Sequence, residues 1–177
     1  MNLEELFKSI VWRGIVSIGR EMEAFSTWTI TGTAAILALL ISNLESLGGA
    51  VSTSGLKLSL SLFVVSLLAG VFSKQYGNAL VTSLRLTDEL RSLLDSEPGQ
   101  DLVANLTIEN NKLAQEISKP FWWPLSRTLK KSFLEGAGDQ LAAEKRQVRL
   151  FCIQLYSNFV HIVTAAFALI SLIVFAY

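Results

Sequence analysis

Residues 150–177, LFCIQLYSNFVHIVTAAFALISLIVFAY, contain no charged side chain. About 20 predominantly apolar residues are enough for a helix to cross the roughly 30 Å hydrocarbon core of a bilayer. A helix over the whole stretch would be about 42 Å long, at a rise of about 1.5 Å per residue. We therefore expect a transmembrane helix here that tilts, or that begins outside the bilayer.

Two earlier stretches have the same character. They are residues 27–47 (TWTITGTAAILALLISNLESL) and residues 56–73 (LKLSLSLFVVSLLAGVFS), each with one charged residue near an end. Only 17% of the chain is charged and its mean hydropathy is +0.44, whereas soluble domains average about 25% charged residues. Residues 56–62 alternate as a strand would, but an isolated strand in lipid leaves its backbone unsatisfied. The predicted fold class is an all-α integral membrane protein with three transmembrane helices.

The basic residues predict how the chain is oriented. Eleven of the fifteen lie between positions 74 and 149, three precede the first span, and one, Lys57, lies where the link between the first two spans meets the second span. Loops rich in Lys and Arg stay in the cytoplasm. We expect a multi-pass protein of the inner cell membrane, with a cytoplasmic N-terminus and the C-terminus outside. Residues 1–24 lack the pattern of a secretory signal peptide, so we expect all three spans to be retained.

Residues 1–24 predict an amphipathic helix. Apolar residues recur there at spacings of three and four, and they are Leu3, Leu6, Phe7, Ile10, Val11, Ile15 and Ile18. Trp12 and the neighbouring basic residues favour a helix that lies on the inner membrane surface. The alternative is a helix whose apolar face packs on the cytoplasmic helices of its own chain.

Residues 25–76 then form a transmembrane hairpin, and residues 77–149 a helical cytoplasmic region. We expect the second span to continue as one helix to about residue 95, because no helix breaker occurs before Pro98. A second cytoplasmic helix would start with Asp101 as its N-cap and end before Pro120. A long third helix would run from residue 139 into the last span, residues 150–177.

An aromatic and basic segment, FWWPLSRTLKKSFLEGAG, occupies residues 121–138. Its residues of interest are Phe121, Trp122, Trp123, Arg127, Lys130 and Lys131. Aromatic rings and basic side chains both favour the headgroup level of a membrane. The same side chains could instead fill the core of the cytoplasmic helices or a contact between subunits.

The polar residues of the last span lie on one helical face. They are Gln154, Ser157, Asn158, His161 and Thr164. A polar stripe at membrane depth often marks a pathway, so one hypothesis is a helix that lines an aqueous pore in a homo-oligomer. The alternative is hydrogen bonding between helices, which stabilises a bundle by about 1 kcal/mol or less per contact.

Small residues line the other two spans. The second span has Ser59, Ser66, Gly70, Ser73 and Gly77 on one stripe, and the first has Thr31, Ala35 and Ala38. Small residues four apart let helices approach closely. We therefore expect tight helix packing, either within one subunit or between subunits.

Composition excludes several kinds of chemistry. With one cysteine and one histidine, we expect no internal disulfide, no metal site and no cofactor. Ten acidic residues nearly balance the basic ones in residues 74–149, so we expect no nucleic-acid binding. A lipid enzyme would have to pair His161 with Glu21, Glu23 or Glu116, and no nucleophile has a plausible base. We expect no enzymatic activity.

Two functions then fit the sequence. The first is a small homo-oligomeric membrane channel or pore, gated from its cytoplasmic helices. The second is a non-conducting membrane scaffold or accessory subunit, which binds a cytoplasmic protein partner through residues 78–138. The state of the polar stripe distinguishes them, because a pore requires a wet stripe and a scaffold a dry one.

Overall fold

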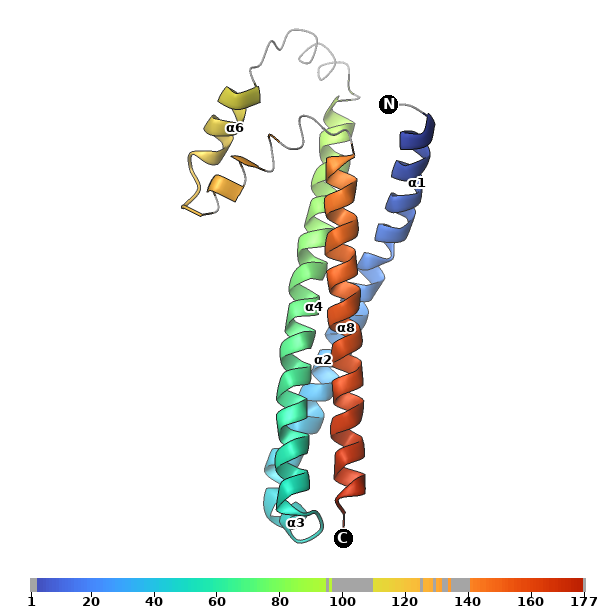
Figure 1. Cartoon of the computed structure of the whole chain (residues 1–177), viewed down its shortest axis with the longest axis vertical. Coiled ribbons are helices and arrows are strands. Elements are labelled where there is room, and N and C mark those ends of the chain that lie inside the picture. The colour runs from blue at the N-terminus through green and yellow to red at the C-terminus, as the bar shows by residue number, and fades with distance from the viewer. Residues whose placement is uncertain are drawn as a thin grey trace. The chain divides into compact units, whose positions relative to one another are not determined.

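The computed structural model describes residues 3–94, 96, 110–124, 126–128, 130, 131, 134 and 141–176. Its named elements are the helices α1 (Leu3–Ser17), α2 (Gly19–Ser42), α3 (Leu44–Gly48), α4 (Thr53–Leu94), α6 (Asn110–Ser118) and α8 (Ala142–Val174), drawn in Figure 1. Three helical stretches are long and apolar enough to cross a membrane, namely Leu3–Ser42, Thr53–Leu93 and Ala142–Val174. The predicted all-α class and its three apolar helices are confirmed for the described residues.

The chain divides into two compact units. Unit 1 combines Met1–Val16 with Thr82–Val148, and unit 2 combines Ser17–Val81 with Arg149–Tyr177. Helices α4 and α8 each contribute residues to both units, and each unit is described separately below.

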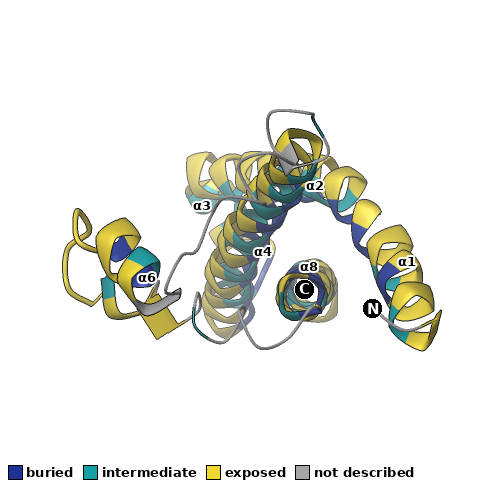
Figure 2. Ribbon diagram, turned by 90° about the horizontal axis from the view of Figure 1, so that it is seen from above, coloured by how far each residue is buried: buried dark blue, intermediate teal, exposed yellow. Residues whose placement is uncertain are grey.

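Unit 2 contains α2 and α3 together with parts of α4 and α8; in it α4 and α8 lie side by side and α2 crosses them obliquely (Figure 1). On α4 its buried residues are spaced by three or four, and they are Gly55, Ser59, Phe63, Ser66, Gly70, Ser73, Gly77 and Leu80. From Phe63 onward the spacing alternates between three and four, so the buried residues form one continuous face along the helix. In Figure 2 the buried, dark blue parts of the α4 ribbon lie along one side of the helix.

The burial pattern of unit 2 is inverted relative to a soluble protein. Its buried side chains include Ser26, Ser59, Ser66, Ser73, Gln154, Asn158 and His161. Its exposed side chains include Val64, Leu68, Phe72, Leu155, Phe159 and Ile170. Soluble domains place large aliphatic and aromatic side chains inside and leave most Ser, Asn and Gln outside.

The N-terminal helices differ from the predicted ranges 1–24 and 27–47. The helix is interrupted at Ile18, and α2 runs from Gly19 to Ser42 without a break near residue 25. Residues 24–27 contain no helix breaker that would separate two helices there. Gly19 follows the interruption directly, and a Cβ added to it would lie 2.5 Å from Leu80 Cδ2, so glycine allows a close approach to α4 at this point. At its other end, Asn43 Nδ2 donates a hydrogen bond to the carbonyl of Leu39 at 2.8 Å. This bond satisfies a terminal carbonyl of α2 and helps to end the helix there.

The later helices match the sequence expectations more closely. Helix α4 is a single helix of 42 residues, as the absence of a breaker predicts. Helix α6 ends at Ser118, ahead of Pro120, and its predicted start at Asp101 lies outside the described residues. Helix α8 is continuous from Ala142 to Val174, and residues 139 and 140 also lie outside the described part.

The loop after α3 meets the end of α8. The backbone N–H of Ser52 donates to the carbonyl of Phe175 at 3.0 Å, and Val51 forms an isolated antiparallel bridge with Ala176. A Cβ at Gly55 would lie 2.3 Å from Phe175 Cβ. Glycine at position 55 is therefore needed for this close approach within unit 2.

Candidate functional site

Three serines of α4 donate hydrogen bonds to backbone carbonyls of α8. Ser59 Oγ donates to Ala168 O at 2.9 Å, Ser66 Oγ to His161 O at 2.8 Å, and Ser73 Oγ to Gln154 O at 3.1 Å. Each step of seven residues along α4 matches a step of seven back along α8. The two helices are therefore antiparallel in a fixed heptad register, with one serine bond every two turns.

We call the buried polar groups of this contact the polar seam. It comprises Ser26 on α2, the serines Ser59, Ser66 and Ser73 on α4, and Gln154, Asn158 and His161 on α8. All seven side chains are buried, and each makes a hydrogen bond to another helix. The seam therefore joins the three helices of unit 2 from inside.

His161 is the largest polar group of the seam. Its Nδ1 lies 2.8 Å from both the hydroxyl and the carbonyl oxygen of Ser66. Because the one hydroxyl proton of Ser66 is donated to His161 O, Nδ1 carries the ring proton and donates to Ser66. In this tautomer Nε2 is an acceptor, and it is buried without a hydrogen-bond partner among the described residues.

Gln154 and Asn158 connect α8 to α2. Gln154 Nε2 donates to Gly19 O at 3.2 Å, while its Oε1 is buried and has no partner among the described residues. Ser26 Oγ lies 3.2 Å from Asn158 Oδ1 and 3.0 Å from Ser73 Oγ. One serine hydroxyl of α2 thus contacts polar groups of both other helices.

Two glycines of α4 make room for the large side chains of α8. A Cβ at Gly70 would lie 3.1 Å from His161 Nδ1, and a Cβ at Gly77 would lie 2.6 Å from Gln154 Nε2. These distances are shorter than ordinary van der Waals contact. The predicted packing residues Ser66, Gly70, Ser73 and Gly77 are all buried in unit 2.

The other predicted stripe residues lie differently. Ser157 is half-buried, and Thr164 Oγ1 donates to carbonyls of its own helix, Val160 O at 2.7 Å and His161 O at 3.1 Å. Neither hydroxyl bonds to another helix in the part of the chain that the structure describes. The polar stripe of α8 is thus used in part for contacts between helices and in part for bonds along α8.

The small residues predicted on the first span are exposed. These are Thr31, Ala35 and Ala38. Helix α2 instead buries Gly19, Ser26 and Thr33, which are spaced by seven. Both faces of α2 are rich in small residues, so composition alone could not choose between them. Packing of the exposed stripe between subunits stays a prediction.

No protein-family model, curated protein or solved structure matches this chain. In the described part of the chain, no group of three or more His, Cys, Asp or Glu residues could hold a metal ion. The hydrogen bonds of His161 go to Ser66 and not to a carboxylate. The function is therefore inferred from the geometry of the chain.

Unit 1 contains a buried carboxylate that the sequence reading missed. Glu144 is 3% exposed, and its Oε1 accepts from Ser9 Oγ at 3.1 Å, Arg13 Nη2 at 3.1 Å and Arg91 Nη2 at 2.8 Å. Nearby, Gln147 Nε2 donates to Thr87 Oγ1 at 3.1 Å. Glu144 and Gln147 extend the buried stripe of α8 towards its N-terminus. Their spacing of three, which continues the spacing of the stripe, was the sequence signal that could have identified them.

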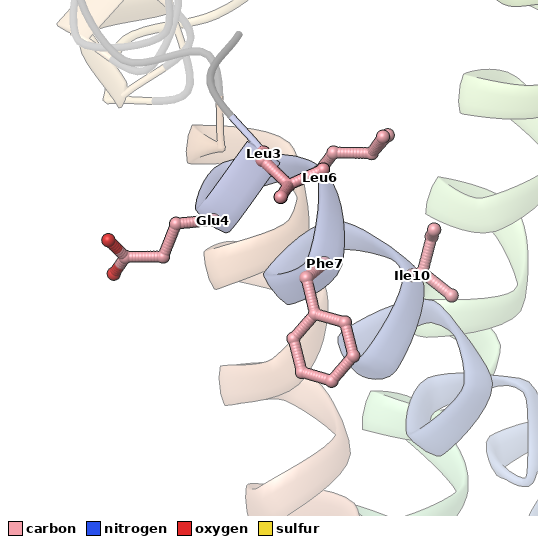
Figure 3. Close-up of a pocket in the computed structure, with 5 residues that line it drawn as sticks. All are labelled: Leu3, Glu4, Leu6, Phe7 and Ile10. Atoms are coloured by element: carbon pink, nitrogen blue, oxygen red, sulfur yellow. The ribbon is translucent and has the colours of Figure 1, made fainter.

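Helix α1 buries only two of its described residues, and most of its large apolar residues are exposed. Ser9 and Val16 are buried, whereas Leu3, Leu6, Phe7 and Ile10 are exposed and line a shallow apolar pocket together with Glu4 (Figure 3). The predicted apolar stripe is therefore exposed and is not buried against the described residues of unit 1. Trp12 is half-buried, and its position at a membrane surface stays a prediction.

The aromatic and basic segment is exposed where the structure describes it. Trp122 is 83% exposed and Trp123 is 68% exposed. The remaining predicted interface residues are also exposed, and they are Phe121, Arg127, Lys130 and Lys131. The two tryptophans do not fill a core of unit 1, which leaves the headgroup position or a contact with another molecule.

Proposed function

We propose that this chain is a non-conducting membrane scaffold or accessory subunit. One observation carries the proposal: Gln154, Asn158 and His161, the central polar residues of α8, are buried and hydrogen-bonded within a single chain. A side chain that is engaged in this way does not need a pore to satisfy its polar groups. The polar stripe then holds three helices together in lipid.

Insertion into a bilayer is part of the proposal. The outward side chains of α4 and α8 are large and apolar, as shown by Val64, Leu68, Phe72 and Phe159. Surrounding lipid removes this surface from water, and the buried serines and amides supply the interhelical contacts that lipid-embedded helices use. The proposed location is the inner cell membrane, and the distribution of Lys and Arg favours a cytoplasmic N-terminus.

The partner of the scaffold would bind unit 1. Three leucines on the part of α4 that belongs to this unit are exposed, namely Leu86, Leu90 and Leu93. Trp122 and Trp123 add exposed aromatic surface within the same unit. Exposed apolar and aromatic side chains of this kind mark protein interaction sites. We propose a cytoplasmic protein that buries such side chains from residues 78–138.

Two experiments test the scaffold. The purified full chain would be reconstituted into vesicles loaded with an ion-sensitive dye, and we expect no flux above that of empty vesicles. A photo-crosslinking residue would then replace Leu90 or Trp122 in cells. We expect a discrete crosslinked protein at these positions and none at the control position Phe159, which faces outward from unit 2. Ion flux across the vesicle membrane above that of empty vesicles would contradict the proposal. Identical crosslinking at positions 90, 122 and 159 would also contradict it.

A homo-oligomeric channel is the second candidate. Its support is that Gln154 Oε1 and His161 Nε2 are buried without a partner among the described residues. Buried water normally satisfies such groups, with about three hydrogen bonds per molecule. A file of water along the seam, admitted when copies assemble and gated from unit 1, would satisfy both atoms. The vesicle flux measurement decides between the two candidates.

A further inference from the structure

The cluster around Glu144 in unit 1 has more positive than negative charge. One carboxylate accepts hydrogen bonds from two guanidinium groups, so the cluster carries a net charge of +1. Glu144 is 3% exposed, whereas the side chains of Arg13 and Arg91 are 43% and 37% exposed. The negative charge is therefore inside and the excess positive charge faces out.

Both arginines keep donors for a further ligand. A guanidinium has five N–H groups, and Glu144 Oε1 accepts one from each arginine. The two Nη2 atoms bind the same oxygen, so their separation cannot exceed the sum of 3.1 and 2.8 Å. A phosphate group, which has several acceptor oxygens, can bridge two guanidiniums at this distance.

The position of the cluster along the sequence favours a lipid as the source of the phosphate. Glu144 precedes Arg149 by five residues on α8, which is about 7.5 Å at a rise of about 1.5 Å per residue. The uncharged stretch 150–177 starts immediately after Arg149. If that stretch crosses the bilayer, as the proposed function requires, Glu144 stands near the level of the lipid headgroups.

We propose that Arg13 and Arg91, held together by Glu144, form a binding site for the phosphate group of an anionic phospholipid. Arginine suits this role because its planar fork binds phosphate through two parallel hydrogen bonds. Glu144 is a positioning residue: it keeps two like charges side by side before the lipid arrives. The lipid then neutralises the remaining positive charge.

The test uses the purified full chain in an uncharged detergent and phosphatidylglycerol as the probe. Native mass spectrometry would measure binding to the wild type and to R13Q, R91Q and R146Q. Arg146 is exposed, and the ion pairs of Glu144 with described residues are to Arg13 and Arg91, so R146Q is a matched loss of one charge. We expect about tenfold weaker binding in R13Q and in R91Q, and wild-type binding in R146Q. Equal binding in all three variants would overturn the proposal.

A second variant separates binding from folding. E144Q keeps an amide oxygen that can accept from both guanidiniums and raises the charge of the cluster from +1 to +2, so it should bind phosphatidylglycerol at least as tightly as the wild type although the protein unfolds at a lower temperature. Loss of lipid binding in E144Q, measured below its unfolding temperature, would show that the cluster is only structural and would overturn the site.

Inorganic phosphate is the last arm of the experiment. We expect it to displace phosphatidylglycerol only at a large excess, because it lacks acyl chains. Displacement at equal concentration would assign the site to free phosphate and overturn the lipid as ligand. The phosphate competition and the comparison of the arginine variants are both measured in detergent, without a bilayer. Their results can therefore be interpreted even if the scaffold proposal is wrong.

Discussion

Gly70 of α4 lies against the imidazole of His161 on α8. A Cβ added at Gly70 would lie 3.1 Å from His161 Nδ1 and 2.7 Å from Ile30 Cγ1 of α2. Three helices therefore meet around a position that has no side chain. His161 can occupy the centre of unit 2 because the opposite helix leaves the space empty there.

Replacing this glycine should disturb all three helices. Gly70→Ala is expected to lower the free energy of unfolding by about 1–3 kcal/mol, because overpacking forces neighbouring groups to shift. Thermal unfolding of the purified protein in detergent measures the change. Gly32→Ala is the matched control, since a Cβ there would meet nothing within 4 Å, and it should be neutral or slightly stabilising. Equal effects of the two changes would contradict this packing.

The hydroxyl of Ser66 should contribute measurably to stability. Ser66→Ala removes the bond to His161 O and the contact with Nδ1, both at 2.8 Å. Interhelical hydrogen bonds in membrane proteins average about 0.6 kcal/mol, so we expect a loss of about 1 kcal/mol in the free energy of unfolding. Ser61→Ala, an exposed position on the same helix, should change it by less than about 0.3 kcal/mol. The same unfolding assay compares them.

Neutralising Glu144 should destabilise unit 1. Glu144→Gln leaves two neighbouring guanidiniums without their counter-charge, and breaking a fully buried ion pair costs about 3–5 kcal/mol. We expect about 1–3 kcal/mol here, because both arginines are partly exposed and solvent screens them. Chemical unfolding monitored by tryptophan fluorescence measures the loss. Glu89→Gln, at an exposed position of α4, should leave the free energy of unfolding almost unchanged. A loss as large as that in Glu144→Gln would show that the burial of Glu144 does not matter for stability.

The loop after α3 and the end of α8 should crosslink within one chain. Val51 and Ala176 form an antiparallel bridge, and Cα atoms of such pairs are about 4.5–5.5 Å apart, within the range of a disulfide. In a Cys152→Ser background, Val51→Cys with Ala176→Cys should form a disulfide that leaves the protein monomeric on a non-reducing gel. Ser46→Cys with Ala176→Cys is the unbridged control. A disulfide-linked dimer would contradict a contact made inside one chain.

Much of the fold follows from local sequence patterns. Long apolar runs without breakers predict α4 and α8, and Pro120 predicts the end of α6. The heptad spacing of Ser59, Ser66 and Ser73 also predicts a helix contact. The partner of that contact does not follow from spacing, because a polar face is the same whether it meets water in a pore or serines of its own chain. Only the register between α4 and α8 in the structure distinguishes a face that meets water from a face that meets serines of the same chain.

Glu144 shows a second limit of sequence reading. A carboxylate among Lys145, Arg146 and Arg149 has the usual appearance of a solvated helix face. Its burial depends on Arg13 and Arg91, which are 131 and 53 residues away in the chain. The pairing is a tertiary contact, so no local pattern could assign it.

The most direct test of the account is the water accessibility of the polar seam. Single Ser→Cys changes at positions 59, 66 and 73, in a Cys152→Ser background, alter one atom each and keep the seam nearly intact. Membranes containing these proteins would be treated with a water-soluble maleimide on both sides. Ser92→Cys, exposed on the part of α4 in unit 1, is the positive control, and labelling after unfolding in detergent confirms each thiol. We expect protection at all three seam positions and rapid labelling at position 92. Labelling at positions 66 and 73 as fast as at position 92 would show a wet seam and contradict the scaffold.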